Sequence, residues 1–300
     1  MPNEIRIDAL MPSEMATRAE YIGVRKAETP LSKVFMLAVL AGAFIALGAL
    51  FATTVSTGGV AVKDPSGAQI YTAAVPWGIQ RLLAGIVFSL GLTLVVVGGA
   101  ELFTGNTLIV MAWANRKVTT AALLRNWTVV YLGNLVGSVA TAGMVFAGKQ
   151  YLFASGAVGV AALSTAKAKC ELGFVQALAL GVLCNALVCL AVWLTYSART
   201  TLDKIAALTL PVAGFVAAGF EHSVANMYFV PYAMMVKAGA GPEFWAAAGK
   251  TPADYPSVNA EAFLLNNLVP VTLGNIVGGA VCVAAVYWAI FLRAAPADGK

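Results

Sequence analysis

The sequence is poor in charged residues and in histidine. Asp, Glu, Lys and Arg together make up 11% of its 300 residues, and it contains 1 histidine. Hydrophobic residues reach 60%, and the mean hydropathy is +0.81. Because a water-soluble globular domain carries about twice this share of charged residues, we exclude that class. The apolar residues fall in long blocks bounded by charges, which is typical of a chain that crosses a lipid bilayer.

Cysteine is also scarce, and several common functional motifs are missing from the sequence. The 4 cysteines form no CxxC pair, so we expect no metal centre, no disulfide framework and no cofactor. No Walker phosphate-binding loop is present, which argues against an ATP-driven pump. The basic residues flank the apolar blocks and do not cluster with aromatic residues, so we expect no nucleic-acid partner. Membrane lipid and a small solute remain as partners.

Charge-free stretches divide the chain into membrane-crossing segments. Two neighbouring pairs of stretches are separated only by Glu101 and by Glu221 with His222, without a hydrophilic loop. Since about 20 apolar residues are needed to cross a bilayer, we interpret each pair as one interrupted span. The sequence therefore predicts an all-α integral membrane protein with six transmembrane helices, of which the second and fifth are broken. The stretches are 34–62, 82–100, 102–115, 126–148, 172–198, 205–220, 223–236 and 262–292.

This pattern divides the chain into three parts. Residues 1–33 form an N-terminal segment in which 12–26 are predicted to form an amphipathic helix, with Pro12 in its first turn. Residues 34–292 form the six-span domain, and residues 293–300 form a tail. With six spans, 12 of the 19 Lys and Arg residues lie on the side of the termini. The positive-inside rule therefore predicts cytoplasmic termini in a multi-pass protein of the plasma (bacterial inner) membrane.

A short motif recurs in the two halves of the domain. The pattern GNxVG occurs at 133–137 and again at 274–278, and Glu101 precedes Asn106 by the spacing that separates Glu221 from Asn226. The halves, about 34–147 and 171–292, each contain three spans. Because three is odd, the second half crosses the membrane in the opposite sense. An inverted repeat of this kind has its substrate site near the midplane, at the broken helices.

Three ionisable residues interrupt the predicted spans, where charge is costly and is usually turned toward the interior of the bundle. We expect Glu101 and Glu221 to accept hydrogen bonds from backbone groups freed at the breaks, with Asn226 as a further polar support. For His222 we expect a direct function, because imidazole changes its charge near physiological pH. A protonated ring attracts or protonates an anion, and a neutral ring still donates one hydrogen bond.

Four runs of the sequence, in this order, resemble the formate/nitrite transporter family. They are ELFTGN at 101–106, YLGNLVG at 131–137, GFEHSVANM at 219–227 and LVPVTLGN at 268–275. The similarity extends over roughly residues 12–293. The run NALVCLAVW at 185–193, together with Pro231, is closest to the formate channels of this family.

The resemblance implies a fold and a set of pore residues. The fold is an aquaporin-like protomer with its own pore, assembled as a homopentamer. By position, His222 corresponds to the central pore histidine and Thr104 to its partner on the first broken loop. Lys169 corresponds to a lysine that draws anions toward the pore, and Asn185 to a polar pore neighbour. The residues that correspond to the apolar constrictions are Phe88, Leu92, Phe103, Val188 and Phe215.

These observations predict a formate channel or proton-coupled formate transporter. An apolar constriction rejects hydrated ions, whereas a weak-acid anion passes once His222 and Thr104 solvate or neutralise it. Nitrite, hydrosulfide and lactate are alternatives, since they are similar in size and charge. The N-terminal helix resembles a segment that covers the cytoplasmic pore mouth at low pH, so we expect pH-dependent gating.

Two readings from other classes are weaker. An intramembrane enzyme would use Ser223 or Cys184 with His222, but no separate motif supplies an oxyanion site or a third, orienting group. A neutral-solute pore of the water or glycerol type would have paired Asn-Pro-Ala loops, and the sequence lacks them. We therefore predict that the chain is not an enzyme.

Overall fold

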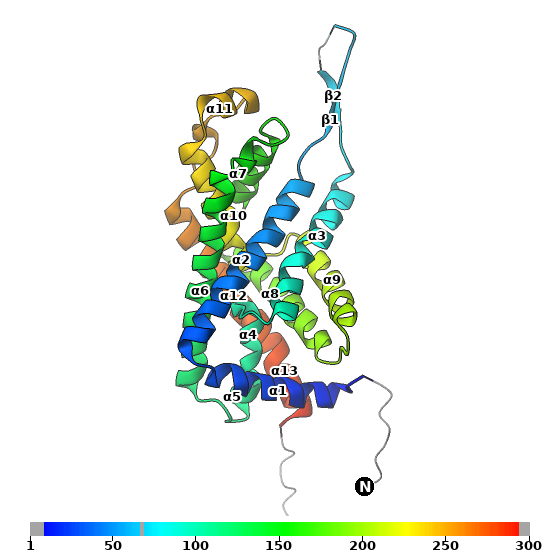
Figure 1. The fold of residues 1–300 in the computed structure, drawn as a ribbon, viewed down its shortest axis with the longest axis vertical. Helices are drawn as coiled ribbons and strands as arrows, with labels where there is room; N and C mark the ends of the chain where they lie inside the picture. Colours follow the sequence, from blue (N-terminus) through cyan, green and yellow to red (C-terminus); the bar gives the residue numbers. More distant parts are fainter. Residues whose placement is uncertain (1–8, 67–68, 294–300) are drawn as a thin grey trace, which may run out of the picture.

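The computed structural model describes residues 9–66 and 69–293. Most of this chain is helical, and its long helices run side by side in one bundle (Figure 1). Helix α1 (Pro12–Glu28) lies across one end of the bundle, and the last helix, α13 (Val286–Phe291), ends at the same end. We call this the α1 end. The predicted tail of residues 293–300 lies, apart from Arg293, outside the described residues.

Helix α1 begins where the sequence predicts and continues slightly further. Pro12 occupies its first turn, and Glu14 caps it by accepting a hydrogen bond from the Met11 backbone N–H at 2.9 Å. Small residues recur on its buried face at helical spacing, and Pro30 then separates it from the next helix. The buried residues are Met15, Ala16, Ala19, Glu20, Gly23 and Ala27.

Among the described residues, 5 helices are long and apolar enough to cross a membrane. Four of them are α2 (Leu31–Val55), α3 (Trp77–Gly98), α6 (Thr120–Ala147) and α8 (Phe174–Thr195). The fifth, Ala262–Phe291, is continuous but changes its winding. It consists of the π-helical η4 (Ala262–Leu268), α12 (Val269–Ile276), the π-helical η5 (Val277–Ala285) and α13.

Two further regions contain a helix interruption. Helix α3 is followed by Gly99 with φ 76°, and helical structure resumes in α4 (Phe103–Asn106), η1 (Thr107–Ile109) and α5 (Val110–Ala114). Helix α9 (Thr201–Ala217) is followed by Gly219 with φ 77° and then by α10 (Ser223–Gly239). Glycine adopts this left-handed conformation without the steric cost of a Cβ atom. The interruptions contain Glu101 and the Glu221–His222 pair.

The opposite end of the bundle carries a projecting β-hairpin (Figure 1). Strand β1 (Val60–Lys63) pairs antiparallel with β2 (Gln69–Ala73), which is an exception to the predicted all-α fold. The sequence analysis placed 60–62 inside a charge-free stretch, but α2 ends at Val55 and a glycine pair follows it. The hairpin end also carries η2 (Gln150–Leu152), α7 (Ala157–Cys170), α11 (Pro242–Ala248) and η3 (Pro252–Asp254).

Close helix pairs bring the interruptions together. Helix α2 packs against α6, and α8 packs against α12 and η5. A Cβ atom on Gly137 would clash with the Val39 carbonyl oxygen, and one on Gly278 would clash with that of Val182. The two GNxVG motifs therefore permit close backbone approach, as small residues do in membrane helices. Helix α3 packs against α9, and α4 contacts α10, so the first turns of helix that follow the two interruptions meet in the interior.

Candidate functional site

The two interruptions meet at a contact between Thr104 and His222. The hydroxyl oxygen of Thr104 lies 3.0 Å from Nε2 of His222, although 118 positions separate the two residues. Both side chains are buried, with 0% of Thr104 and 3% of His222 exposed. The structure thus brings together the two residues that the resemblance paired.

The backbone of α10 determines which ring nitrogen of His222 carries a proton. His222 is the N-cap of α10, and its Nδ1 accepts a hydrogen bond from the Ala225 backbone N–H at 3.0 Å. Since an accepting nitrogen carries no hydrogen, the neutral ring is protonated on Nε2. The Nε2–H group therefore donates toward Thr104. A second proton on the ring would occupy Nδ1 and break the cap.

Aromatic rings border His222 toward the hairpin end. The Phe215 ring stacks on the imidazole with centroids 6.0 Å apart, and Phe88 meets Phe215 edge-on at 5.7 Å. Both phenylalanines are buried. The polar pair therefore adjoins an apolar collar, which penalises a hydrated ion.

A cavity of about 780 Å³ lies on the hairpin side of the Thr104–His222 contact. We call it the hairpin-side cavity. Its lining includes His222, Phe88 and Phe215 at the inner limit, and Trp77 and Gln80 toward the hairpin end. The charged side chains of this lining are Arg81, Lys169 and Glu221. A chamber with an excess of positive charge favours anions.

A second cavity, of about 240 Å³, lies toward the α1 end. This α1-side cavity is lined by Leu92 and Leu102 and is bordered by Ile22 and Lys26 of α1. Arg18 of α1 donates to the Tyr196 carbonyl oxygen at 2.9 Å and so holds the helix across this opening. Thr104 lines neither cavity and lies between them.

A polar network supports the first interruption. Lys26 Nζ lies 2.8 Å from Glu101 Oε1 and 2.9 Å from Asn106 Oδ1. The Asn106 amide donates to Glu101 Oε2 at 2.6 Å and to Asn126 Oδ1 at 2.9 Å. Asn126 in turn donates to the Lys26 carbonyl oxygen at 3.2 Å. Both oxygens of the Glu101 carboxylate therefore accept from side chains, and not from the freed backbone N–H groups that the sequence analysis predicted.

An equivalent network supports the second interruption. Lys169 Nζ lies 2.8 Å from Glu221 Oε1, and the Asn226 amide donates to Glu221 Oε2 and to Asn267 Oδ1, both at 2.7 Å. Asn267 donates to the Lys169 carbonyl oxygen at 3.0 Å. The networks differ in two respects, since Asn226 Oδ1 has no hydrogen-bond partner among the described residues and Asn267 also donates to Glu221 Oε2 at 3.3 Å. Lys169 instead lies 5.4 Å from the ring of Phe229.

Asn134, from the first GNxVG motif, holds the backbone of the first interruption. Its amide donates to the carbonyl oxygens of Ala38 at 2.8 Å and Glu101 at 2.9 Å. Its own oxygen accepts the Phe103 backbone N–H at 2.9 Å. Backbone groups that lack a helical partner at the break are thereby satisfied, as burial requires.

Asn275, from the second motif, does the same for the second interruption. It donates to the carbonyl oxygens of Gly181 at 2.8 Å and Glu221 at 2.9 Å, and it accepts the Ser223 backbone N–H at 2.9 Å. These last two contacts lie on either side of His222. Asn275 therefore fixes the backbone from which the imidazole projects.

Asn185 lies behind Thr104 and lines neither cavity. Its amide donates to the Thr104 carbonyl oxygen at 3.2 Å and to the Asn275 carbonyl oxygen at 2.6 Å. Thr107 also donates to the Thr104 carbonyl oxygen, at 2.7 Å. Asn185 thus connects the backbone that carries Thr104 to the residue that holds the His222 loop.

The five predicted constriction residues lie in different places. Phe88 and Phe215 line the hairpin-side cavity, and Leu92 lines the α1-side cavity. Phe103 packs edge-on against a ring of α6 at 4.9 Å, and Val188 is 1% exposed. Neither of these two lines the hairpin-side cavity or the α1-side cavity.

Sequence reasoning missed the site roles of Lys26, Arg81, Asn126 and Asn267. The sequence places Lys26 only at the end of the predicted amphipathic helix. A signal was nevertheless present, because Asn126 precedes the first GNxVG asparagine by the spacing that separates Asn267 from the second. Among the described residues, no group of three or more His, Cys, Asp or Glu side chains is placed so that it could hold a metal ion.

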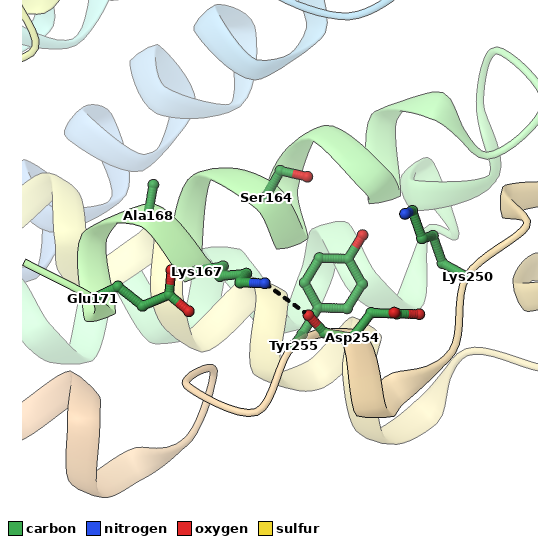
Figure 2. A pocket seen from close by; sticks show the side chains of 7 residues that line it. All are labelled: Ser164, Lys167, Ala168, Glu171, Lys250, Asp254 and Tyr255. Carbon is green, nitrogen blue, oxygen red and sulfur yellow. Dashed lines mark hydrogen bonds between the residues drawn. The ribbon is translucent and has the colours of Figure 1, made fainter.

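A shallow hollow at the hairpin end adjoins the larger cavity (Figure 2). Ser164 and Ala168 line both. The hollow contains two cations and two carboxylates, namely Lys167, Lys250, Glu171 and Asp254. The Thr251 backbone N–H lowers the pKa of the Asp254 carboxyl, so this group is ionised at neutral pH. The charges of the hollow therefore balance.

Comparisons with known proteins match almost the whole chain. The formate/nitrite transporter family matches residues 13–289. The formate channel FocA of Escherichia coli K12 is 43% identical over 286 residues, covering 95% of this chain and 96% of that protein. A solved structure described as a pentameric formate channel with formate bound is 46% identical, with a TM-score of 0.79 over 88% of this chain and 98% of its own. A structure described as an FNT family ion channel is 27% identical, with a TM-score of 0.74 over 93% and 99%.

Proposed function

The chain belongs to the formate/nitrite transporter family, and we propose that it conducts formate, or a similarly small monovalent anion, through a pore in each protomer. The observation that carries this proposal is the Thr104–His222 contact. It lies where the two helix interruptions meet, between two cavities that approach it from opposite ends of the bundle. The relatives named above are channels, and no catalytic step is part of the proposal.

The proposed path runs from one cavity to the other. An anion enters the hairpin-side cavity, passes Phe88 and Phe215, meets His222 and Thr104, and leaves past Leu92. Loss of water from an unpaired charge is costly. At the narrow point the Nε2–H of His222 and the hydroxyl of Thr104 replace part of the lost hydration. Lys169 is proposed to lie on the approach to this point, and Asn185 to support it from behind.

Proton coupling follows from the chemistry of the ring. In the neutral state His222 donates one hydrogen bond toward Thr104 and accepts one from Ala225. At lower pH the ring takes a second proton, loses the Ala225 hydrogen bond and becomes a cation. It then attracts the anion and transfers the proton to a carboxylate oxygen, which returns the ring to its neutral form. Formic acid then leaves past the apolar Leu92 at lower cost than the ion would.

The proposed architecture has six spans arranged as an inverted repeat. Each interrupted region counts as one span, and the equivalent networks around Glu101 and Glu221 support a relation between the halves 34–147 and 171–292. The α1 end then faces the cytoplasm, with residues 1–33 and 293–300 on that side of the inner membrane. Reporter fusions at both termini should give the cytoplasmic signal. A periplasmic signal from either terminus would contradict the proposed orientation.

The proposed assembly is a homopentamer in the membrane. It is supported by the likeness to a solved pentameric channel and by large apolar side chains exposed on the bundle. Native mass spectrometry after gentle detergent extraction should give a mass of five chains. A monomer that retains full transport would contradict the assembly and leave the pore proposal intact.

Helix α1 is proposed to act as a gate at the cytoplasmic opening. It borders the α1-side cavity through Ile22 and Lys26, and Arg18 holds it to the end of α8. Replacing Arg18 with Gln removes this attachment. The variant should transport faster than wild type at the pH where wild-type flux is lowest, and an unchanged flux would remove the gating role.

Flux of labelled formate into proteoliposomes tests the proposed function directly. Wild-type protein should give saturable flux that exceeds empty vesicles and rises as the pH falls. Nitrite, hydrosulfide and lactate serve as competitors, and the anion with the lowest inhibition constant is the main substrate. Flux no greater than that of empty vesicles would contradict the proposal.

The enzyme alternative has little structural support. The Ser223 hydroxyl has no hydrogen-bond partner among the described residues, and Nε2 of His222 faces Thr104 instead. Nucleophilic catalysis needs the hydroxyl or thiol within reach of the base. The neutral-solute alternative is distinguished from an anion channel in the same proteoliposomes, since it requires glycerol or water to pass faster than formate.

A further inference from the structure

Arg81 of α3 reaches across to the end of α9. Its guanidinium donates to the carbonyl oxygens of Val216 and, at 3.3 Å, of Ala217. These are among the last carbonyl groups of α9, where the helix carries partial negative charge and a cation is stabilising. The guanidinium also lies beside Gly219. Arg81 thus holds the segment that leads from α9 to His222.

The same side chain supplies the excess charge of the hairpin-side cavity. Among the described residues of its lining, the ionised groups are Arg81, Lys169 and Glu221. Lys169 and Glu221 lie 2.8 Å apart and form an ion pair. Their opposite charges therefore produce largely cancelling fields in the rest of the cavity. Arg81 donates to backbone carbonyl groups and lies 6.0 Å from the Trp77 ring, and it forms no ion pair with a carboxylate among the described residues. The cavity therefore has an excess of one positive charge, and Arg81 provides it.

We propose that Arg81 concentrates anions in the hairpin-side cavity and thereby sets the half-saturating concentration for transport from that side, a role that rests on the proposed function. A low-dielectric cavity focuses the field of one cation, and such focusing raises the local concentration of counter-ions about tenfold or more. The two-pronged contact with α9 adds a positioning role, because it holds the approach to His222 in place. The neighbouring hollow has no such excess, since its lining contains two lysines and two carboxylates (Figure 2).

Three variants separate charge from positioning. Arg81→Gln removes the charge and the two-pronged contact, whereas Arg81→Lys keeps the charge and loses that contact. Gln176→Glu leaves Arg81 untouched and adds a negative charge at another lining position, so it cancels the excess without disturbing the α9 contact. Lys250→Gln is the matched control, because it removes one charge at the same end of the bundle but outside this cavity.

Initial formate uptake is measured against formate concentration in cells without other formate transporters, at low and high ionic strength and constant osmolarity. Arg81→Gln and Gln176→Glu should each raise the half-saturating concentration about tenfold at low ionic strength. The difference should shrink in salt, because the Debye length falls from about 30 Å at 0.01 M to about 10 Å at 0.1 M. Arg81→Lys should keep the wild-type half-saturating concentration with a lower maximal rate, and Lys250→Gln should match wild type.

The result that overturns the inference is a wild-type half-saturating concentration in Gln176→Glu and in folded Arg81→Gln. A rise in Arg81→Lys equal to that in Arg81→Gln would equally contradict the role of charge. Because Gln176→Glu does not alter the α9 contact, it decides the question even where Arg81→Gln does not fold. Absence of formate uptake by wild type is a different outcome, which would remove the proposed function itself.

Discussion

Lys26 and Lys169 make equivalent ion pairs in the two halves of the chain, each with its Nζ 2.8 Å from a glutamate at a helix interruption. Lys26 projects from α1 to Glu101, and Lys169 projects from α7 to Glu221. Each pair therefore ties an interrupted region to a helix outside it. Because both glutamates are largely buried, these pairs support the breaks.

Replacing Glu101 with Gln should destabilise the protein, because Lys26 then loses its counter-charge. Breaking a buried pair by removing one partner costs about 3–5 kcal/mol, and partial exposure of the Lys26 side chain reduces this to about 1–3 kcal/mol. The measurement is thermal unfolding in detergent. The double variant with Lys26→Met should recover part of the loss, and Glu261→Gln, at an exposed position, is the control. Equal melting temperatures for Glu101→Gln and the control would contradict the supporting role.

Replacing Asn275 with Ala should lower both stability and flux. The change leaves the Ser223 N–H and the Glu221 carbonyl oxygen without their partner on either side of His222. At about 1 kcal/mol for each of the lost hydrogen bonds, the expected cost is about 2–4 kcal/mol. Unfolding and formate flux are measured on the same preparation. Asn266→Ala is the control, because Asn266 is exposed and its side chain makes no hydrogen bond among the described residues. Wild-type flux in Asn275→Ala would show that the loop holds its shape without this residue.

Thr104→Val and Thr104→Ser test the hydroxyl that faces His222. Valine has the same shape but no hydroxyl group, so Nε2–H loses its acceptor at 3.0 Å. The loss of one hydrogen bond of about 1 kcal/mol corresponds to a roughly fivefold lower flux. Serine keeps the hydroxyl and should transport within about twofold of wild type. If both variants lose flux equally, the methyl group matters and the hydrogen bond does not.

Phe215→Leu tests the apolar collar. Phe215 stacks on His222 and contacts Phe88, so a smaller side chain widens the passage and admits partly hydrated ions. Formate flux should fall little or rise, while chloride and lactate flux should increase. Leu210→Ala, a large exposed side chain on α9, is the control. Unchanged selectivity in Phe215→Leu would place the constriction elsewhere.

Much of the fold follows from the sequence because hydropathy and length determine where a helix crosses a bilayer. The amphipathic helix before the first span, the long apolar helices and the positions of the two interruptions all lie near their predicted places. The β-hairpin was not predicted, since residues 60–62 are as apolar as the span before them. Helices α7 and α11 were likewise not predicted, because neither is long enough to register as a span.

The site was only partly predictable, for physical reasons. Glu101, Glu221 and His222 could be singled out because they interrupt apolar spans. An ionisable side chain is energetically costly in hydrocarbon, so its presence there indicates a role. Asn185, Phe103 and Val188 were named from the resemblance, yet they line neither cavity. The role of Arg81 depends on a contact between helices from different halves, which no local pattern encodes.

In the proposed mechanism, His222 provides both the hydrogen-bond donor and the proton switch of the pathway. The most direct test is formate flux against pH, from about pH 5 to about pH 8, in proteoliposomes with wild type and His222→Asn. Asparagine keeps an oxygen that can cap α10, as His222 Nδ1 does, but it does not titrate. We expect wild-type flux that rises as the pH falls and a flat, lower profile for His222→Asn. A variant profile that rises in parallel with wild type would contradict this mechanism.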